Sequence, residues 1–293
     1  LLESASGSSI PYIYSGATAQ GSGSSKIHSA LADILAQQHA WGQPKKKKEP
    51  FTHAILAKLN EQVLYLASFD SSTHLDRLAA VFDWLALGLH TGSRLGKYGQ
   101  SKPSKKSLFA TVPAGPSKGD PIAFMRSDFV FWTSSMTELP HSLAIARPTE
   151  AFEVHLRFRY DKSPRNYTII KFRRDPARGF LCPCHLVISI LRRADTLRVP
   201  PQYPVGVFRS AADTHGLGYA FISGPHMCDT LRATCIAAYP DPAHYLRQHL
   251  DRLVAHSTRV TAAVALRAMG WTIPSIAVRL RWKTESVETY LRE

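Results

Sequence analysis

The sequence predicts an α+β protein that is mainly helical and carries a small antiparallel β-sheet. Apolar residues recur at helical spacing before and after the middle of the chain, whereas residues 121–174 alternate in polarity and are rich in aromatic side chains. Helices on both sides of one short β region are typical of an α+β domain in which the sheet is the minor part. With 293 residues, 44% of them hydrophobic, the chain can bury a sizeable core.

The N-terminal residues are predicted to lie outside the main domain. Residues 1–25 are rich in Ser, Gly and Ala, show no helical or strand period, and are expected to be a flexible segment. Residues 26–41 place apolar side chains on one helical face, and Gly42 and Pro44 end this predicted helix. A basic linker, Lys45–Lys48, comes next. Because the first residue is Leu rather than Met, we expect a fragment of a longer protein.

Two helices should open the globular part. Thr52 is a good N-cap for a helix that extends to about Ala67. A second helix is expected over about 74–90, ending at Thr91–Gly92, where Gly suits a C-terminal cap. Residues 101–120 are rich in Lys, Ser, Pro and Gly, which predicts a loop.

The middle of the chain should form the sheet. Residues 121–133 read as a strand, and residues 151–160 and 167–174 read as a hairpin around the turn sequence DKSPRN. Further helices are expected over 182–194, 226–239 and 242–254.

The net charge of +14 favours a polyanionic partner, with nucleic acid first and an anionic membrane surface second. No run of 18 apolar residues occurs, so no membrane span is expected, and the first residues lack the pattern of a signal peptide. The stretch PKKKKEP, which contains Lys45–Lys48, fits a nuclear import signal and a solvated linker equally well. We expect a nuclear location if the host is eukaryotic and a cytoplasmic one otherwise.

The 4 cysteines do not match a usual metal-site spacing. Cys182 and Cys184 form a CPC sequence followed by His185, but Cys228 and Cys235 lie far away and complete no zinc pattern. We expect them to be small buried side chains in a reducing compartment, with no metal or cofactor.

Residues 256–293 carry the most informative pattern of the chain. H-x-x-R occurs four times, so the motif alone has little value. The pair His256 and Arg259 differs from the other pairs in the elements C-terminal to it. In order, these elements are an apolar helix ending at Gly270, a helix begun by Thr272 with Pro274 in its first turn, Trp282, and a short helix begun at Thr284 that carries Tyr290.

This order of His, Arg, Trp and Tyr resembles the C-terminal active-site segment of the tyrosine recombinase family. The resemblance covers residues 49–293 and implies the catalytic domain of that family, with its DNA breaking–rejoining enzyme fold. Residues 26–48 resemble the last helix of the family's core-binding domain together with its linker, so they are expected to be a remnant of that domain.

Two further site residues come from the same resemblance. LGLHTGSR, residues 87–94, is similar to the family's T-G-x-R segment, which assigns Arg94 as the first active-site arginine. The predicted hairpin is similar to the one whose turn carries the family's catalytic lysine. That position is Lys162, and Lys171 is the alternative.

The resemblance implies that Tyr290 attacks a DNA phosphodiester, giving a 3′-phosphotyrosyl intermediate and a free 5′-hydroxyl. Arg94 and Arg259 can bind the non-bridging oxygens bidentately, because a guanidinium is permanently charged. A phenol ordinarily has a pKa of about 10, so it needs a base or relay, for which His256 is the candidate.

Three other side chains complete the expected site. The indole N–H of Trp282 can donate to the phosphate while its ring supports the site, and Lys162 can protonate the leaving 5′-oxygen. Lys97 stands where the family usually has an acidic residue, so it adds repulsion near the arginines and removes a carboxylate that could orient them.

The implied function is site-specific recombination or integration of a mobile element. The expected partners are double-stranded DNA and further copies of the chain in a tetrameric synapse. Lys97 keeps open a second hypothesis, a decayed or domesticated relative that binds DNA without cutting it. A type IB topoisomerase shares the chemistry, but its larger clamp elements are not visible in the sequence.

Overall fold

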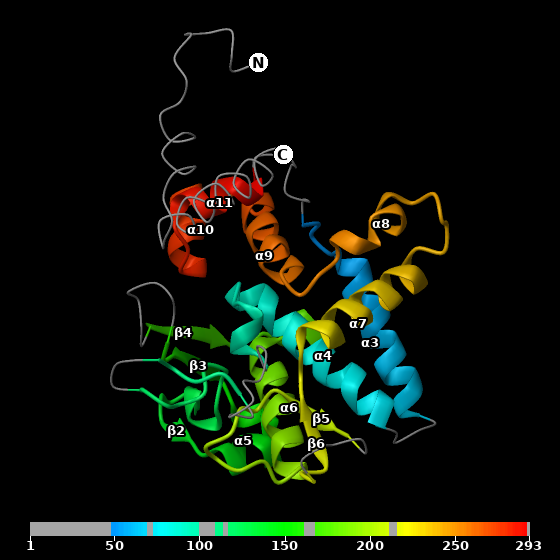
Figure 1. The fold of residues 1–293 in the computed structure, drawn as a ribbon. Coiled ribbons are helices and arrows are strands. Elements are labelled where there is room, and N and C mark those ends of the chain that lie inside the picture. The colour runs from blue at the N-terminus through cyan, green and yellow to red at the C-terminus, as the bar shows by residue number, and fades with distance from the viewer. Residues whose placement is uncertain are drawn as a thin grey trace, which may run out of the picture. The chain divides into compact units, whose positions relative to one another are not determined.

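A computed structural model describes residues 48–68, 73–99, 109–113, 117–160, 168–210 and 216–291. The residues from Lys48 onward form one compact unit, shown in Figure 1. The predictions for residues 1–47 therefore lie outside the described residues. No helix in the described ranges is long and apolar enough to cross a membrane.

The first two described helices confirm the sequence prediction. Helix α3 is His53–Ala67, and its N-cap Thr52 accepts a hydrogen bond from the amide of Ile55 at 3.4 Å. Helix α4 is Thr73–Thr91, and its second half is almost wholly buried. It ends at Gly92, whose φ of +55° is a conformation that glycine adopts without steric cost.

The larger sheet has the strand order β2-β1-β3-β4, and all its pairs are antiparallel. Its strands are β1 Phe129–Trp132, β2 Glu138–Leu139, β3 Glu153–Phe158 and β4 Thr168–Arg173. The predicted hairpin is confirmed: β3 and β4 pair from Glu153↔Arg173 to Phe158↔Thr168. The small antiparallel sheet in a mainly helical chain confirms the α+β class.

The strand predicted over 121–133 is wrong for its first part. Only Phe129–Trp132 is a strand, and Arg126–Asp128 forms a 3₁₀ turn instead. The Asp128 carboxylate accepts from the amide of Met125 at 2.8 Å and from the Arg159 side chain at 2.6 Å. This local side-chain bond competes with a ladder hydrogen bond and holds the turn.

Two helices, α5 (His141–Ala146) and α6 (Pro183–Thr196), pack against the larger sheet. Helix α6 confirms the helix predicted there and contacts both α4 and the β3–β4 hairpin. Three elements that the sequence did not reveal are the helix α5 and the strands of a second, two-stranded sheet. They are α5 His141–Ala146, β5 Val207–Arg209 and β6 Tyr219–Phe221.

Helix α7, Gly224–Ala238, agrees with the prediction, but the helix predicted over 242–254 is wrong. This stretch contains only α8, Tyr245–Gln248, and a 3₁₀ turn, Leu250–Arg252. His249 between them has φ −123° and ψ 33°, which no helix continues. The His244 imidazole also accepts from the amide of Leu246, so the side chain serves a short turn rather than a longer helix.

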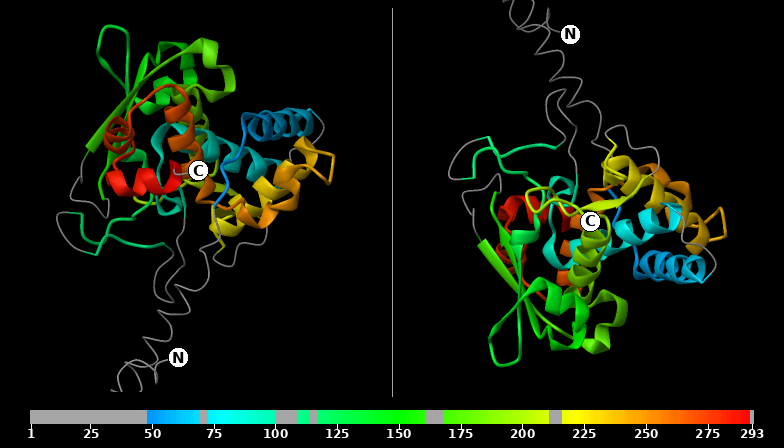
Figure 2. Two further views of the ribbon diagram at one scale, coloured as in Figure 1. Left: turned by 90° about the horizontal axis from the view of Figure 1, so that it is seen from above. Right: turned by 90° about the horizontal axis from the view of Figure 1, so that it is seen from below.

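The last three helices form a separate small core at the C-terminal end of α4. They are α9 Ser257–Ala268, α10 Ile273–Leu280 and α11 Thr284–Leu291, as predicted. Trp282 and Val287 are among the residues of this small core. In both views of Figure 2 these helices, drawn in orange and red, lie next to the cyan helix α4.

Candidate active site

His256 and Tyr290 meet although 34 positions separate them in the sequence. His256 precedes the first turn of α9, and Tyr290 lies on α11, which packs against α9. The imidazole Nε2 lies 2.5 Å from the phenol oxygen. The ring of Trp282 stands edge-on to the Tyr290 ring, with 5.4 Å between the centroids. A base, a hydroxyl and a supporting ring are therefore grouped in one place.

Arg259 lies one helical turn after His256 and is buried. Its Nη1 donates to the carbonyl oxygen of Gly92 at 2.9 Å, and its guanidinium lies over the Trp282 ring, 3.9 Å from the centroid. The indole N–H of Trp282 donates to the same Gly92 carbonyl at 3.3 Å. This one carbonyl oxygen thus orients both side chains.

The turn that follows α4 presents three successive carbonyl oxygens to side chains of the site. The Thr91 oxygen accepts from Arg281 at 3.1 Å, and the Ser93 oxygen accepts from the buried Tyr98 hydroxyl at 2.9 Å. Between them, the Gly92 oxygen accepts from Arg259 and from Trp282. Charge-assisted and buried hydrogen bonds of this kind hold a turn in one conformation.

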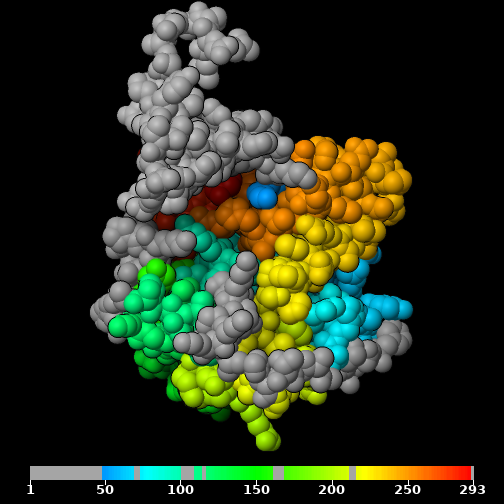
Figure 3. Space-filling view, viewed as in Figure 1, coloured from blue at the N-terminus to red at the C-terminus, as the bar shows by residue number. Residues whose placement is uncertain are grey.

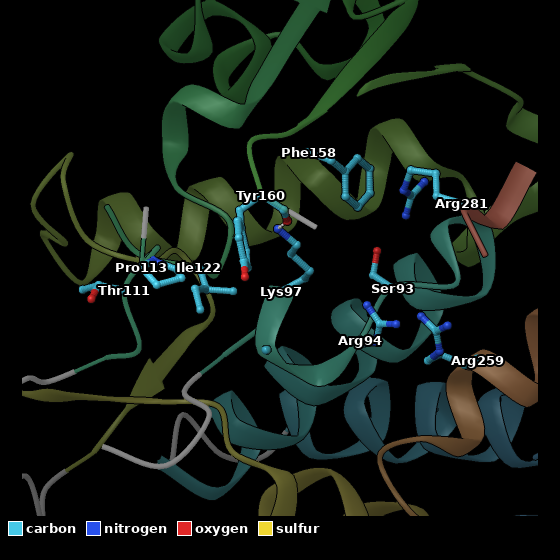
Figure 4. A pocket seen from close by; sticks show the side chains of 11 residues that line it. Ser93, Arg94, Lys97, Thr111, Pro113, Ile122, Phe158, Tyr160, Arg259 and Arg281 are labelled. Carbon is cyan, nitrogen blue, oxygen red and sulfur yellow. Dashed lines mark hydrogen bonds between the residues drawn. The ribbon is translucent and has the colours of Figure 1, made fainter. Parts of the chain in front are cut away.

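A cavity of about 360 Å³ opens beside this turn. We call it the cationic cavity. Its lining residues are Ser93, Arg94, Gly96, Lys97, Thr111, Pro113, Ile122, Phe158, Tyr160, Arg259 and Arg281. They include four cationic side chains and, within the described parts of the chain, no Asp or Glu. Figure 4 shows Lys97 and the three arginines arranged around it, and in Figure 3 the orange atoms of α9 adjoin the teal residues after α4.

Burial and neighbouring cations keep the His256 imidazole neutral. Burial lowers its pKa most, and the charges of Arg259, Arg94 and Lys48 lower it further, to about 4. A neutral imidazole can accept a proton at Nε2. At neutral pH, His256 is therefore in the state that a base needs.

Lys97 is buried and belongs to the cationic cavity. Its ammonium group donates to the Tyr160 carbonyl oxygen and lies 5.7 Å from the centre of the Tyr160 ring. Lys97 thus adds a positive charge to the cavity that Arg94 and Arg259 also line.

Of the two candidate catalytic lysines, only Lys171 belongs to the described residues. Lys162 lies outside the described residues. Lys171 is exposed on β4, opposite His155 in the β3–β4 ladder, and it is not among the residues that line the cationic cavity. Tyr160, two positions before Lys162, does line the cavity.

Pairwise contacts connect four of the predicted site residues, and a fifth lines the same cavity. His256, Arg259, Trp282 and Tyr290 form one group, and Arg94 is exposed but lines the same cavity as Arg259. Sequence reasoning missed Ser93 and Arg281. No sequence signal marks either, since Ser93 sits inside the TGSR segment and Arg281 merely precedes Trp282.

The cysteines confirm the prediction of burial at Cys182, Cys184 and Cys235, while Cys228 is half-buried. No cluster of three or more His, Cys, Asp or Glu placed to hold a metal ion occurs among the described residues. Comparison of the sequence with protein-family models and with curated proteins finds no match.

Proposed function

We propose that this chain cleaves and rejoins DNA strands through a covalent bond to Tyr290, as a site-specific recombinase of the tyrosine recombinase type. The observation that carries the proposal is the 2.5 Å contact between His256 and the Tyr290 hydroxyl, beside the buried Arg259. A base, a nucleophile and a cation that binds phosphate oxygens are the groups that phosphodiester cleavage without a metal needs.

In the proposed reaction the Tyr290 hydroxyl gives its proton to His256 as its oxygen attacks phosphorus. The new bond joins the tyrosine oxygen to the 3′-phosphate, and the bond from phosphorus to the 5′-oxygen breaks. The guanidinium groups of Arg94 and Arg259 stabilise the charge on the non-bridging oxygens. Lys162 protonates the leaving 5′-oxygen, and attack by a 5′-hydroxyl reverses these steps.

Trp282 has a positioning role in this proposal. Its N–H already donates to the Gly92 carbonyl, and its ring supports the Arg259 guanidinium. The side chain can therefore hold Arg259 in place without binding the phosphate itself.

The proposed substrate is double-stranded DNA of a mobile element, and the proposed assembly is a tetramer that pairs two DNA sites. The net charge of +14 and the cationic cavity support a polyanionic substrate. A nuclear location in a eukaryotic host, or a cytoplasmic one otherwise, belongs to the same proposal.

A second candidate is a relative that binds DNA but does not cut it. Lys97 favours this candidate, because its buried charge lies near two arginines where a carboxylate would orient them. This second function predicts DNA binding with no covalent intermediate.

The first test is the trapping of a phosphotyrosyl adduct. The protein is incubated with a nicked suicide substrate and run on a denaturing gel. We expect wild type to form an adduct and Tyr290→Phe to form none, because the nucleophilic oxygen is gone, while both bind DNA with equal affinity. An adduct that persists in Tyr290→Phe would show that another residue is the nucleophile.

Two control experiments separate the competing functions. Absence of an adduct in wild type, with an adduct in Lys97→Glu, would establish the DNA-binding relative instead. Relaxation of supercoiled plasmid without any recombinant product would indicate a topoisomerase.

A further inference from the structure

The cationic cavity is larger and more positively charged than one phosphodiester requires. Arg94 and Arg259 already supply two guanidinium groups for the single negative charge of a phosphodiester. Lys97 and Arg281 add two more cations on the same cavity of about 360 Å³. These two side chains have no role in the reaction proposed above.

Arg281 combines a left-handed backbone conformation with a place on the cavity wall. It ends α10 with φ 58° and ψ 41°, the left-handed region, which favours glycine over other residues. The side chain is nonetheless buried. Its guanidinium stacks 3.5 Å from the centroid of the Phe158 ring and donates to the Thr91 carbonyl. Backbone outliers of this kind cluster at active sites and ligand sites.

Ser93 provides an independent indication of a ligand. Its side chain is only 3% exposed and lines the cavity. Its hydroxyl has no hydrogen-bond partner within the part of the chain that the structure describes. A buried hydroxyl without a partner is costly, and an anion in the cavity would satisfy it.

Lys97 also lines the cationic cavity. Its ammonium group is held against the cavity by the Tyr160 carbonyl oxygen. An ammonium at this place adds a positive charge to the cavity wall, which favours an anion there. The aromatic rings of Phe158 and Tyr160 form the nearby apolar wall.

We propose that Arg281, Lys97 and Ser93 form a second phosphate subsite, which binds the phosphate next to the scissile one on the same DNA strand. This inference rests on the proposed function and identifies a further part of its substrate. Two phosphates balance four cations better than one, and the half-buried Tyr160 can contact the sugar or base between them. The subsite also explains why a lysine is tolerated at position 97.

The test compares two small ligands by calorimetry. One is a thymidine dinucleotide with a 5′-phosphate, which carries two phosphates at the spacing of a DNA strand. The other is the same dinucleotide without the 5′-phosphate, which carries one. We expect wild type to bind the first at least about tenfold more tightly, the factor that one charge-assisted contact supplies.

The variants are Arg281→Gly and Lys97→Met, with Arg267→Met as the matched control. Glycine adopts the φ of 58° at position 281 without strain, so Arg281→Gly should keep the backbone at the end of α10 while losing the preference. Arg267 is exposed on α9 and donates only to the Trp271 carbonyl among the contacts described, so its removal should leave the preference intact. Should Arg281→Gly fail to fold, Ser93→Ala and Lys97→Met supply the same comparison.

The outcome is separate from that of the covalent test. Equal affinity of wild type for the two dinucleotides, or an unchanged preference in both Arg281→Gly and Lys97→Met, would overturn the second subsite even if Tyr290 forms an adduct. A preference that these variants abolish would support the subsite even if no adduct forms.

Discussion

At the scale of single residues, the protonation of His256 determines what the site can do. Its pKa of about 4 results first from burial and then from the charges of Arg259, Arg94 and Lys48. Two of these cations, Arg94 and Arg259, are the proposed phosphate ligands, so the same charges also help to keep the imidazole neutral and able to accept a proton. The short contact with Tyr290 connects this electrostatic effect to the proposed nucleophile.

The lowered pKa of His256 predicts the pH dependence of the proposed cleavage. His256 is neutral above about pH 5 and becomes protonated only as the pH falls through about 4. We expect single-turnover adduct formation on the suicide substrate to stay level from about pH 7 to about pH 5 and to fall below that. A midpoint at the ordinary histidine value of about 6.5 would contradict the burial argument.

Acid stability must be checked in the same series. The pKa of His90 is also lowered to about 4, mainly by burial. Between the unfolded pKa of about 6.5 and the folded pKa of about 4, the unfolded chain binds protons at His90 and His256 that the folded chain does not. Stability therefore falls as the pH decreases through this window, and circular dichroism at each pH separates unfolding from lost catalysis.

At the scale of elements, the site depends on how closely α9 approaches α4. A Cβ built on Gly88 of α4 would lie 2.2 Å from the Cγ2 methyl of Thr258 on α9. Only glycine permits this approach, and it brings Arg259 within reach of the Gly92 carbonyl. The packing of α4 against α9 thus sets the position of Arg259, the side chain that is proposed to bind phosphate.

Gly88→Ala should test this packing. We expect the free energy of unfolding to fall by about 1–3 kcal/mol, because the added methyl overpacks the interface. Thr258→Ser removes the opposing methyl, so the double variant should recover most of the loss. Denaturant titration of both single variants and the double variant measures the coupling. Additive losses would show that the two residues do not share this contact.

The β3–β4 hairpin carries the two candidate general acids. Lys171 is exposed within β4 and is not among the cavity residues. Lys162 lies outside the described residues, but Tyr160, two positions before it in the sequence, does line the cavity. We expect Lys162→Ala to slow cleavage strongly and Lys171→Ala to have little effect. A substrate with sulfur in place of the leaving 5′-oxygen needs no proton, so it should restore cleavage by Lys162→Ala. Failure of the sulfur substrate to do so would exclude Lys162 as the acid.

At the scale of the whole molecule, the excess of positive charge concerns partners rather than the fold. Ion pairs such as Arg193 with Asp83 and Arg159 with Asp128 are buried and neutralise the interior locally. The net charge of +14 is therefore available to attract a polyanion such as DNA.

Salt should weaken DNA binding steeply. If about six or more phosphates are contacted, the affinity should fall about a thousandfold or more between about 50 and 200 mM salt. Fluorescence anisotropy with Tyr290→Phe measures this without covalent chemistry. An affinity that barely changes with salt would argue against a phosphate-dominated interface.

Several elements could be predicted because their signals are local. Thr52 as an N-cap, Gly92 after α4 and the alternation in β3 and β4 each act within a few residues. The failures have non-local or side-chain causes. The Asp128 carboxylate holds a 3₁₀ turn in place of the predicted strand through the Met125 amide and is itself bound by Arg159, which is 31 positions away. His249 interrupts an otherwise helical pattern.

The sequence by itself determined the α+β class and, by resemblance, the candidate residues His256, Arg259, Trp282 and Tyr290, because order and spacing along the chain carry that information. Only the tertiary structure decided that Gly92 orients Arg259 and Trp282, and that Lys97 and Arg281 share one cavity. Those contacts join segments far apart in the chain, and they depend on helix packing that no local pattern records.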